Sequence, residues 1–66
     1  MNKLGYNLKC RREAVGLDQQ ELAERVGSSQ SIISYIEKGI KIPSVALLTA
    51  IADVLDCSID MLLGRR

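Results

Sequence analysis

Apolar residues recur along the chain at the three- and four-residue spacing of short amphipathic helices. In the first segment, from about Lys3 to Val15, one face carries Leu4, Leu8 and Val15. Arg11 falls in the middle of this stripe, where its aliphatic stem can be covered while its guanidinium group reaches water. The spacing therefore predicts a first helix with one inward face.

Two further helices are predicted from polar residues that can cap them. Asp18 is followed three residues later by Glu21, which is an acidic version of the capping box. Ser29 can cap a third segment at residues 30–38. The apolar positions expected to face inward in these two segments are Leu22, Ala23, Val26, Ile33 and Ile36.

The fourth segment, residues 45–55, follows Pro43 and Ser44 and carries two apolar stripes. A helix needs one apolar face to join the core of a monomer, so a second stripe on a small domain indicates that another surface covers it. The first stripe is Val45, Leu48, Ala52 and Leu55, with Ile51 at its edge. The second stripe is Leu47, Ala50 and Val54.

Four of the predicted helical segments are followed by a glycine, which is the residue that most often forms a left-handed C-terminal cap. Ser58 can cap a last short helix in which Ile59, Leu62 and Leu63 face inward. No strand-like alternation extends beyond a few residues, so the predicted fold class is all-α with five short helices. The four glycines that follow helical segments are Gly16, Gly27, Gly39 and Gly64.

The amino-acid composition limits the kinds of site that the chain can form. The chain has 66 residues, of which 47% are hydrophobic, so we expect one domain near the lower size limit for folding alone. It contains no histidine, and Cys10 and Cys57 lie far apart in the sequence. This excludes a zinc site of the usual spacing, a disulfide framework and histidine-based acid–base catalysis. We therefore expect no metal, no cofactor and no enzymatic activity.

The expected location is the cytoplasm. No apolar run is long enough to span a membrane, and no apolar signal core follows the first three residues. Both thiols would then stay reduced, and we expect them to be inert. The net charge of +1 does not by itself predict a nucleic-acid partner. Positive charge is nevertheless concentrated near the N-terminus, at Lys3, Lys9, Arg11 and Arg12.

The joint at Gly27-Ser28-Ser29 predicts a helix-turn-helix at about residues 19–38, with the small Ala23 where the two helices cross. A wider pattern is more specific: Leu17-Asp18-Gln19-Gln20-Glu21-Leu22-Ala23, Val26-Gly27, Ser29-Gln30-Ser31, Ile33-Ser34, Ile36-Glu37-Lys38-Gly39, Pro43-Ser44 and Ser58-Ile59-Asp60-Met61-Leu62-Leu63-Gly64. On these motifs, residues 4–64 resemble the Cro/C1-type (XRE-like) helix-turn-helix family of phage repressors and Cro. The resemblance implies a lambda-repressor-like DNA-binding domain.

The resemblance also implies roles for individual residues. The third helix would enter the major groove of double-stranded DNA while the second crosses the backbone. The side chains presented to base edges would be Gln30, Ser31, Ser34 and Tyr35. The phosphate contacts would be Gln19, Ser29, Lys38 and Lys41. Arg12 and Glu37 match an ion pair found in some members, which we interpret as structural.

Simpler interpretations remain open for these residues. Gln30, Ser31 and Ser34 could form an ordinary solvated helix face, and Tyr35 could pack partly against neighbouring helices. Lys38 and Lys41 could be solubilising charges.

A homodimer is predicted from the second apolar stripe. Relatives in the family often have charged or polar residues at the positions of Ala46, Leu47, Ala50 and Met61, which are all apolar here. The fourth and fifth helices would meet across a two-fold axis. The alternative is that some of these residues complete the core of the monomer. The predicted interface residues are Leu47, Ala50, Val54 and Met61.

The function predicted from the sequence is a sequence-specific transcriptional regulator, most simply a repressor that binds a near-palindromic operator as a homodimer. No small-molecule ligand and no membrane are expected. The alternative is an antitoxin or protein-interaction module that neutralises a partner protein and binds DNA secondarily.

Overall fold

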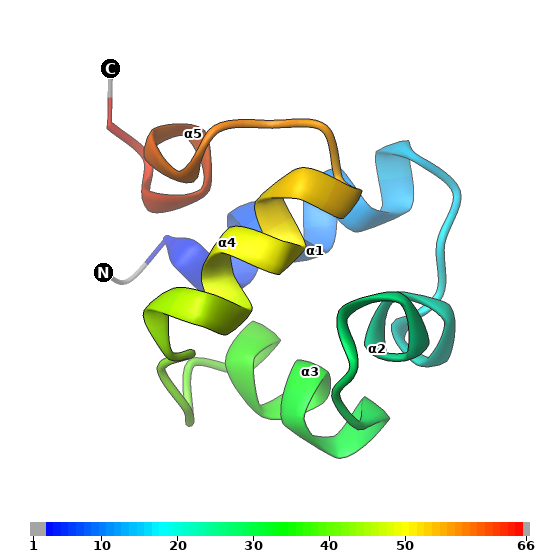
Figure 1. Cartoon of the computed structure of the whole chain (residues 1–66). Helices are drawn as coiled ribbons and strands as arrows, with labels where there is room; N and C mark the ends of the chain where they lie inside the picture. Colours follow the sequence, from blue (N-terminus) through cyan, green and yellow to red (C-terminus); the bar gives the residue numbers. More distant parts are fainter. Residues whose placement is uncertain (1–2, 66) are drawn as a thin grey trace.

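The computed structural model describes residues 3–65, and this part of the chain is all-helical (Figure 1). The predicted all-α fold class is confirmed. The helices are α1 (Leu4–Ala14), α2 (Gln19–Val26), α3 (Gln30–Glu37), α4 (Val45–Val54) and α5 (Ile59–Leu63). Within the described residues, no helix has the length and apolar character needed to cross a membrane.

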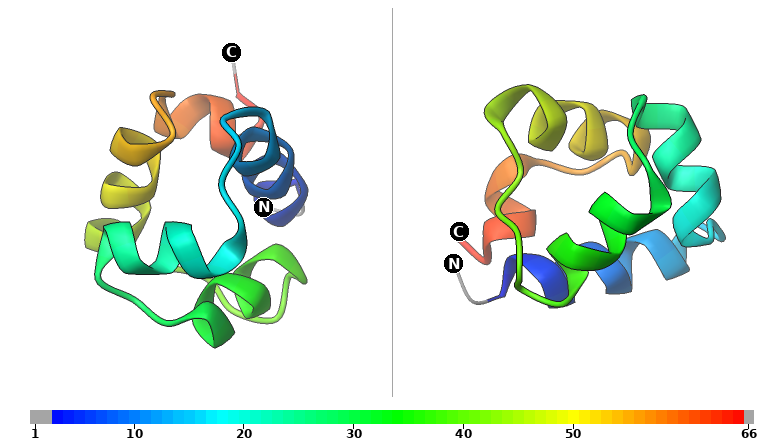
Figure 2. Two further views of the ribbon diagram at one scale, coloured as in Figure 1. Left: turned by 90° about the vertical axis from the view of Figure 1, so that its right-hand side faces the viewer. Right: turned by 90° about the horizontal axis from the view of Figure 1, so that it is seen from below.

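The helices surround one apolar core (Figure 2). Helix α3 packs against α1 and α2, while α4 packs against α2 and α5, and α5 returns to α1. The two ends of the described chain therefore lie on the same side of the molecule (Figure 1). The largest fully buried side chains are Leu8, Leu22, Ile33, Ile36, Ile51, Leu55 and Leu62.

Side-chain caps begin four of the helices. The capping box predicted at α2 is present: the Glu21 amide donates to Asp18 Oδ1 over 2.7 Å, and the Asp18 amide donates to Glu21 Oε1 over 2.9 Å. Ser29 caps α3 as predicted, accepting from the Ile32 amide over 3.2 Å. Such caps satisfy amides that have no partner inside the helix. The other two serine caps are Ser44 and Ser58.

The chain turns at the glycines that follow the helices. All four glycines predicted as C-terminal caps have a positive φ, and Gly27, at +71°, ends α2 and turns the chain toward α3. Gly5 has a different role that the sequence did not indicate. It is buried inside α1, and a Cβ atom there would collide with the backbone carbonyl oxygens of Ile36 and Glu37. The missing side chain therefore lets α1 approach the end of α3.

Three details differ from the sequence-based expectations. Val15 lies beyond the end of α1 and is exposed rather than inward-facing. Val45 is 80% exposed, because side chains lean toward the N-terminus of their helix and Val45 is the first residue of α4. Ile51, expected at the edge of its stripe, is fully buried.

Arg11 also differs from expectation. Its Nε donates to the Leu55 carbonyl over 2.9 Å, and its terminal nitrogen donates to the Asp56 carbonyl over 3.1 Å. Because the end of a helix carries partial negative charge and unpaired carbonyls, a guanidinium group is stabilised there. The guanidinium therefore binds the end of α4 instead of simply reaching water.

Candidate nucleic-acid interface

Helices α2 and α3 meet at a tight turn. Ala23 is buried at the crossing, and its carbonyl accepts from the Ser28 amide over 2.8 Å. The small side chain allows the close approach, and the hydrogen bond closes the turn after Gly27. The two helices thus form a helix-turn-helix supported by packing against α1 and α4.

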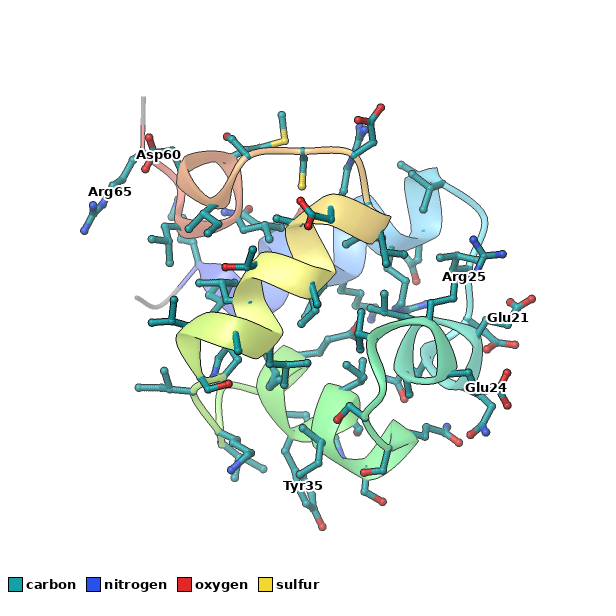
Figure 3. The ribbon with its side chains drawn as sticks, in the orientation of Figure 1. Glu21, Glu24, Arg25, Tyr35, Asp60 and Arg65 are labelled. Atoms are coloured by element: carbon teal, nitrogen blue, oxygen red, sulfur yellow. The ribbon has the colours of Figure 1, made fainter. Side chains whose placement is uncertain are left out.

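The outer face of α3 carries polar side chains. Gln30, Ser31 and Tyr35 are exposed and Ser34 is half-buried, whereas Ile33 and Ile36 on the opposite face are buried. Figure 3 shows that Tyr35 projects from α3 away from the rest of the molecule. The structure therefore brings the predicted base-reading residues together on one accessible face.

The charged side chains of α2 lie elsewhere. Glu21, Glu24 and Arg25 project toward a different side of the molecule from Tyr35 (Figure 3). A carboxylate beside a DNA phosphate would weaken binding, because like charges repel. The orientation of α2 keeps these two carboxylates away from the outer face of α3.

Three of the predicted phosphate-contacting residues are exposed around α3. Ser29 precedes the helix, Lys38 follows it, and Lys41 lies in the loop to α4. The Ser29 oxygen accepts from the Ile32 amide, so its hydroxyl proton is still able to donate to an anion. Neither lysine forms an ion pair with any residue between 3 and 65.

A buried ion pair joins α1 to the end of α3, as the resemblance implied. Arg12 Nε lies 2.7 Å from Glu37 Oε2, and the two side chains are only 8% and 4% exposed. The guanidinium also donates to Glu37 Oε1 over 3.1 Å and to the Leu17 carbonyl over 2.8 Å. Hydrogen bonding to Glu37 raises the pKa of Arg12, while burial opposes this increase. The pair fixes α3 relative to α1.

Gln19 joins the same network, which the sequence did not indicate. Its side-chain amide donates to Glu37 Oε1 over 3.0 Å, so the carboxylate of Glu37 binds groups from both α1 and α2. An amide nitrogen has two protons, and the second is able to donate to a phosphate. Gln19 therefore links the start of α2 to the end of α3.

The predicted dimer residues have mixed environments. Leu47 and Val54 pack partly against the core, and Ala50 is also partly exposed. Met61 is exposed on α5 and lines an open, mainly apolar groove with residues of α1, among them Cys10 and Ala14. The apolar surface thus extends from α5 onto α1.

The two cysteines have different environments. Cys10 is exposed, and partial burial raises the pKa of the Cys57 thiol, which favours the unreactive protonated form. Among the described residues, no group of three or more potential metal ligands of the His, Cys, Asp or Glu type comes together.

A helix-turn-helix that presents an exposed polar helix from a small helical domain defines a class of DNA-binding proteins. The chain belongs to the helix-turn-helix family, whose profile matches residues 8–62. Its fold and motifs are those of the phage repressor and Cro type.

Named relatives agree with this assignment. The chain is 38% identical to the uncharacterized HTH-type transcriptional regulator YazB of Bacillus subtilis, over 88% of this chain and 84% of YazB. It is 34% identical to SinR of the same species over 96% of this chain, but it spans only 58% of SinR. The N-terminal DNA-binding domain of SinR superposes with a TM-score of 0.89, covering 96% of this chain and 93% of that domain at 34% identity. The P22 c2 repressor, solved with a synthetic operator, superposes with a TM-score of 0.86, covering 89% of each chain at 32% identity.

Proposed function

We propose that this DNA-binding transcriptional regulator is a repressor that binds a near-palindromic operator as a homodimer. Residues 4–64 form the DNA-binding domain, which acts in the cytoplasm by covering a promoter, without catalysis or a cofactor. The observation that carries the proposal is the accessible polar face of α3, held in place by the buried Arg12–Glu37 pair. Solved relatives bound to DNA, the P22 c2 repressor and SinR, support it.

Base reading falls to the exposed residues of α3. The Gln30 amide donates and accepts together, which matches the N7 and N6 edge of adenine in the major groove. Ser31 and Ser34 are short and discriminate less between bases. Tyr35 packs against a thymine methyl group or donates its hydroxyl proton to a phosphate.

Phosphate contacts set the position of the domain on the duplex. At the start of α2, the Asp18 carboxylate already accepts from the Glu21 amide. The other amides of the first turn and the second amide proton of Gln19 are able to donate to a phosphate. Ser29, Lys38 and Lys41 supply further contacts around α3. The lysine contacts would make binding strongly dependent on salt.

The Gln30→Ala variant tests base reading. It is expected to weaken binding to a selected operator by about 1–3 kcal/mol, and to weaken non-specific binding much less. Gel-shift titrations with an operator selected from random DNA and with a scrambled duplex measure both losses. Gln20→Ala is the matched control, because Gln20 is exposed on α2 and bonds to Glu24. An equal loss on all duplexes, or no loss, would contradict base reading by Gln30.

The homodimer is proposed through α4 and α5, with Leu47, Ala50, Val54 and Met61 at the contact. These apolar side chains are only partly covered in the single chain, and a two-fold contact covers the same surface on both copies. Such a dimer would place two copies of α3 about 34 Å apart, one turn of DNA.

Ala50→Glu tests the dimer. The new charge is accommodated by the monomer, since Ala50 is partly exposed, but it would be buried without a partner at the contact. We expect the dimer to dissociate and affinity for the full operator to fall toward that for a half-site. Sedimentation equilibrium measures the association, and Thr49→Glu, at an exposed position on the same helix, is the control. A wild-type chain that stays monomeric at tens of micromolar would overturn the proposal.

A further inference from the structure

A hollow of about 320 Å³ lies between the first turn of α1 and the loop from α3 to α4. Figure 2 shows this loop running beside the start of α1. Its lining includes Leu4, Gly5 and Ile36, which are buried, together with Tyr6 and Ile42, which are exposed. Its volume lies at the lower end of the range that small-molecule pockets occupy.

Apolar surface at this hollow is left uncovered. Ile42 is 69% exposed although it stands beside buried apolar residues. Ile40, on the other side of Lys41, is also 69% exposed, but it lies outside the lining. A ligand with an apolar body would remove the surface around Ile42 and Tyr6 from water, which is favourable.

The charge around the hollow is positive. Lys38 and Lys41 belong to its lining, and neither forms an ion pair with a described residue. The carboxylate in the lining is Glu37, which already binds Arg12 and Gln19 and has a 4% exposed side chain. An anion would therefore meet two cations and no free carboxylate among these lining residues.

We propose that this hollow binds a small organic anion with an apolar ring, which acts as an effector. The ring would lie against Leu4, Tyr6 and Ile42, and the anionic group would approach Lys38 and Lys41. These are the same lysines proposed to contact DNA phosphates, so the bound anion competes with DNA for them. This competition rests on the proposed function, whereas binding of the anion does not.

Phenylacetate, 2-phenylethanol and 2-phenylethylamine test the site, because they share one ring and differ in charge. Two-dimensional amide NMR spectra of the full chain follow each titration. We expect phenylacetate to shift the amides of Gly5, Tyr6, Gly39 and Ile42, with a dissociation constant of about millimolar size for so small a ligand. It should bind about tenfold more tightly than the amine. Equal binding of all three compounds, or shifts located elsewhere, would overturn the proposal.

Two matched variants locate the binding. Ile42→Glu places a negative charge at the rim and is expected to weaken phenylacetate binding about tenfold. Ile40→Glu makes the same change at an equally exposed position outside the hollow, and should leave binding within about twofold because the charge is screened by salt. Both positions are exposed enough for the fold to tolerate the change, which the amide spectra verify. An equal effect of the two variants would overturn the site.

Competition with DNA is measured separately. Operator affinity should fall several-fold when phenylacetate is added at saturation, and acetate at equal ionic strength should leave it unchanged. If phenylacetate binds in the hollow but operator affinity does not change, the effector role is wrong and the binding site stands. If the wild-type chain binds no operator at all, the proposed function fails, while the NMR titration still decides the site.

Discussion

The Gly5→Ala variant is expected to lose most of its stability, by about 3 kcal/mol, which is the upper part of the usual range for overpacking. The added Cβ would meet the carbonyl oxygen of Glu37 and would lie 2.6 Å from that of Ile36. Backbone oxygens at the end of α3 cannot turn aside as a flexible side chain can. Helix α1 would therefore have to move away from α3 and open the core between them.

Urea denaturation followed by far-UV circular dichroism measures this loss. The sign of the change is the decisive result, because alanine at an unobstructed helical position would stabilise the chain by about 1 kcal/mol relative to glycine. Ala14→Gly, at the exposed end of the same helix, is the control and should cost no more than that amount. A Gly5→Ala variant as stable as the wild type would show that α1 and α3 do not pack as described.

Local rules account for the features that the sequence predicted correctly. The capping box at Asp18 and Glu21 and the serine cap at Ser29 depend on groups three residues apart. The glycine turns likewise depend on the φ of a single residue, as at Gly27. Such features form with little influence from the rest of the chain, so spacing alone is enough to find them.

Features set by tertiary packing were not predicted. Gly5 looks like an ordinary weak helix former until α3 lies against it. Val45 fits the spacing of an inward face, but the core ends before its side chain reaches it. The bond from Gln19 to Glu37 joins residues on different helices and leaves no sequence pattern of its own.

The prediction of the DNA interface depended on the resemblance to the helix-turn-helix family more than on the spacing of residues. The pattern around Gln30 and Ser34 predicted a polar helix face, and the family motifs turned that face into expected base contacts. The hollow beside Ile42 was not foreseen, because its lining comes from α1 and from a loop distant in sequence. The sequence predicted no small-molecule ligand, whereas the anion site proposed here would bind one.

Removal of Glu37 is the second change expected to have a large effect. Glu37→Ala would leave the guanidinium of Arg12 buried with the Leu17 carbonyl as its remaining described partner. Breaking a buried pair from one side typically costs about 3–5 kcal/mol, because the remaining charge has no compensation. A domain of this size has roughly that much stability in total. We therefore expect the variant to be largely unfolded at room temperature.

The double variant Arg12→Met/Glu37→Leu tests why Glu37→Ala destabilises the domain. It removes both charges, so no unpaired charge stays buried. Without either charge, packing of apolar side chains should restore most of the stability lost by Glu37→Ala, as seen for buried pairs in general. Urea denaturation of Arg12→Met, of Glu37→Leu and of the double variant gives the coupling energy. If the double variant is as unstable as the sum of the single variants, the two side chains do not interact in the way that we describe.

DNA binding by the double variant then tests what the ion pair contributes to recognition. Glu37 is the last residue of α3 and is bound from α1 through Arg12 and from α2 through Gln19. Apolar replacements can support the fold, but they do not reproduce these directed hydrogen bonds, so the angle of α3 is less tightly fixed. We expect a folded double variant with weaker operator binding, because precise positioning of α3 is what base contacts require. Unchanged operator affinity in gel-shift titrations would show that the pair stabilises the domain without orienting its reading helix.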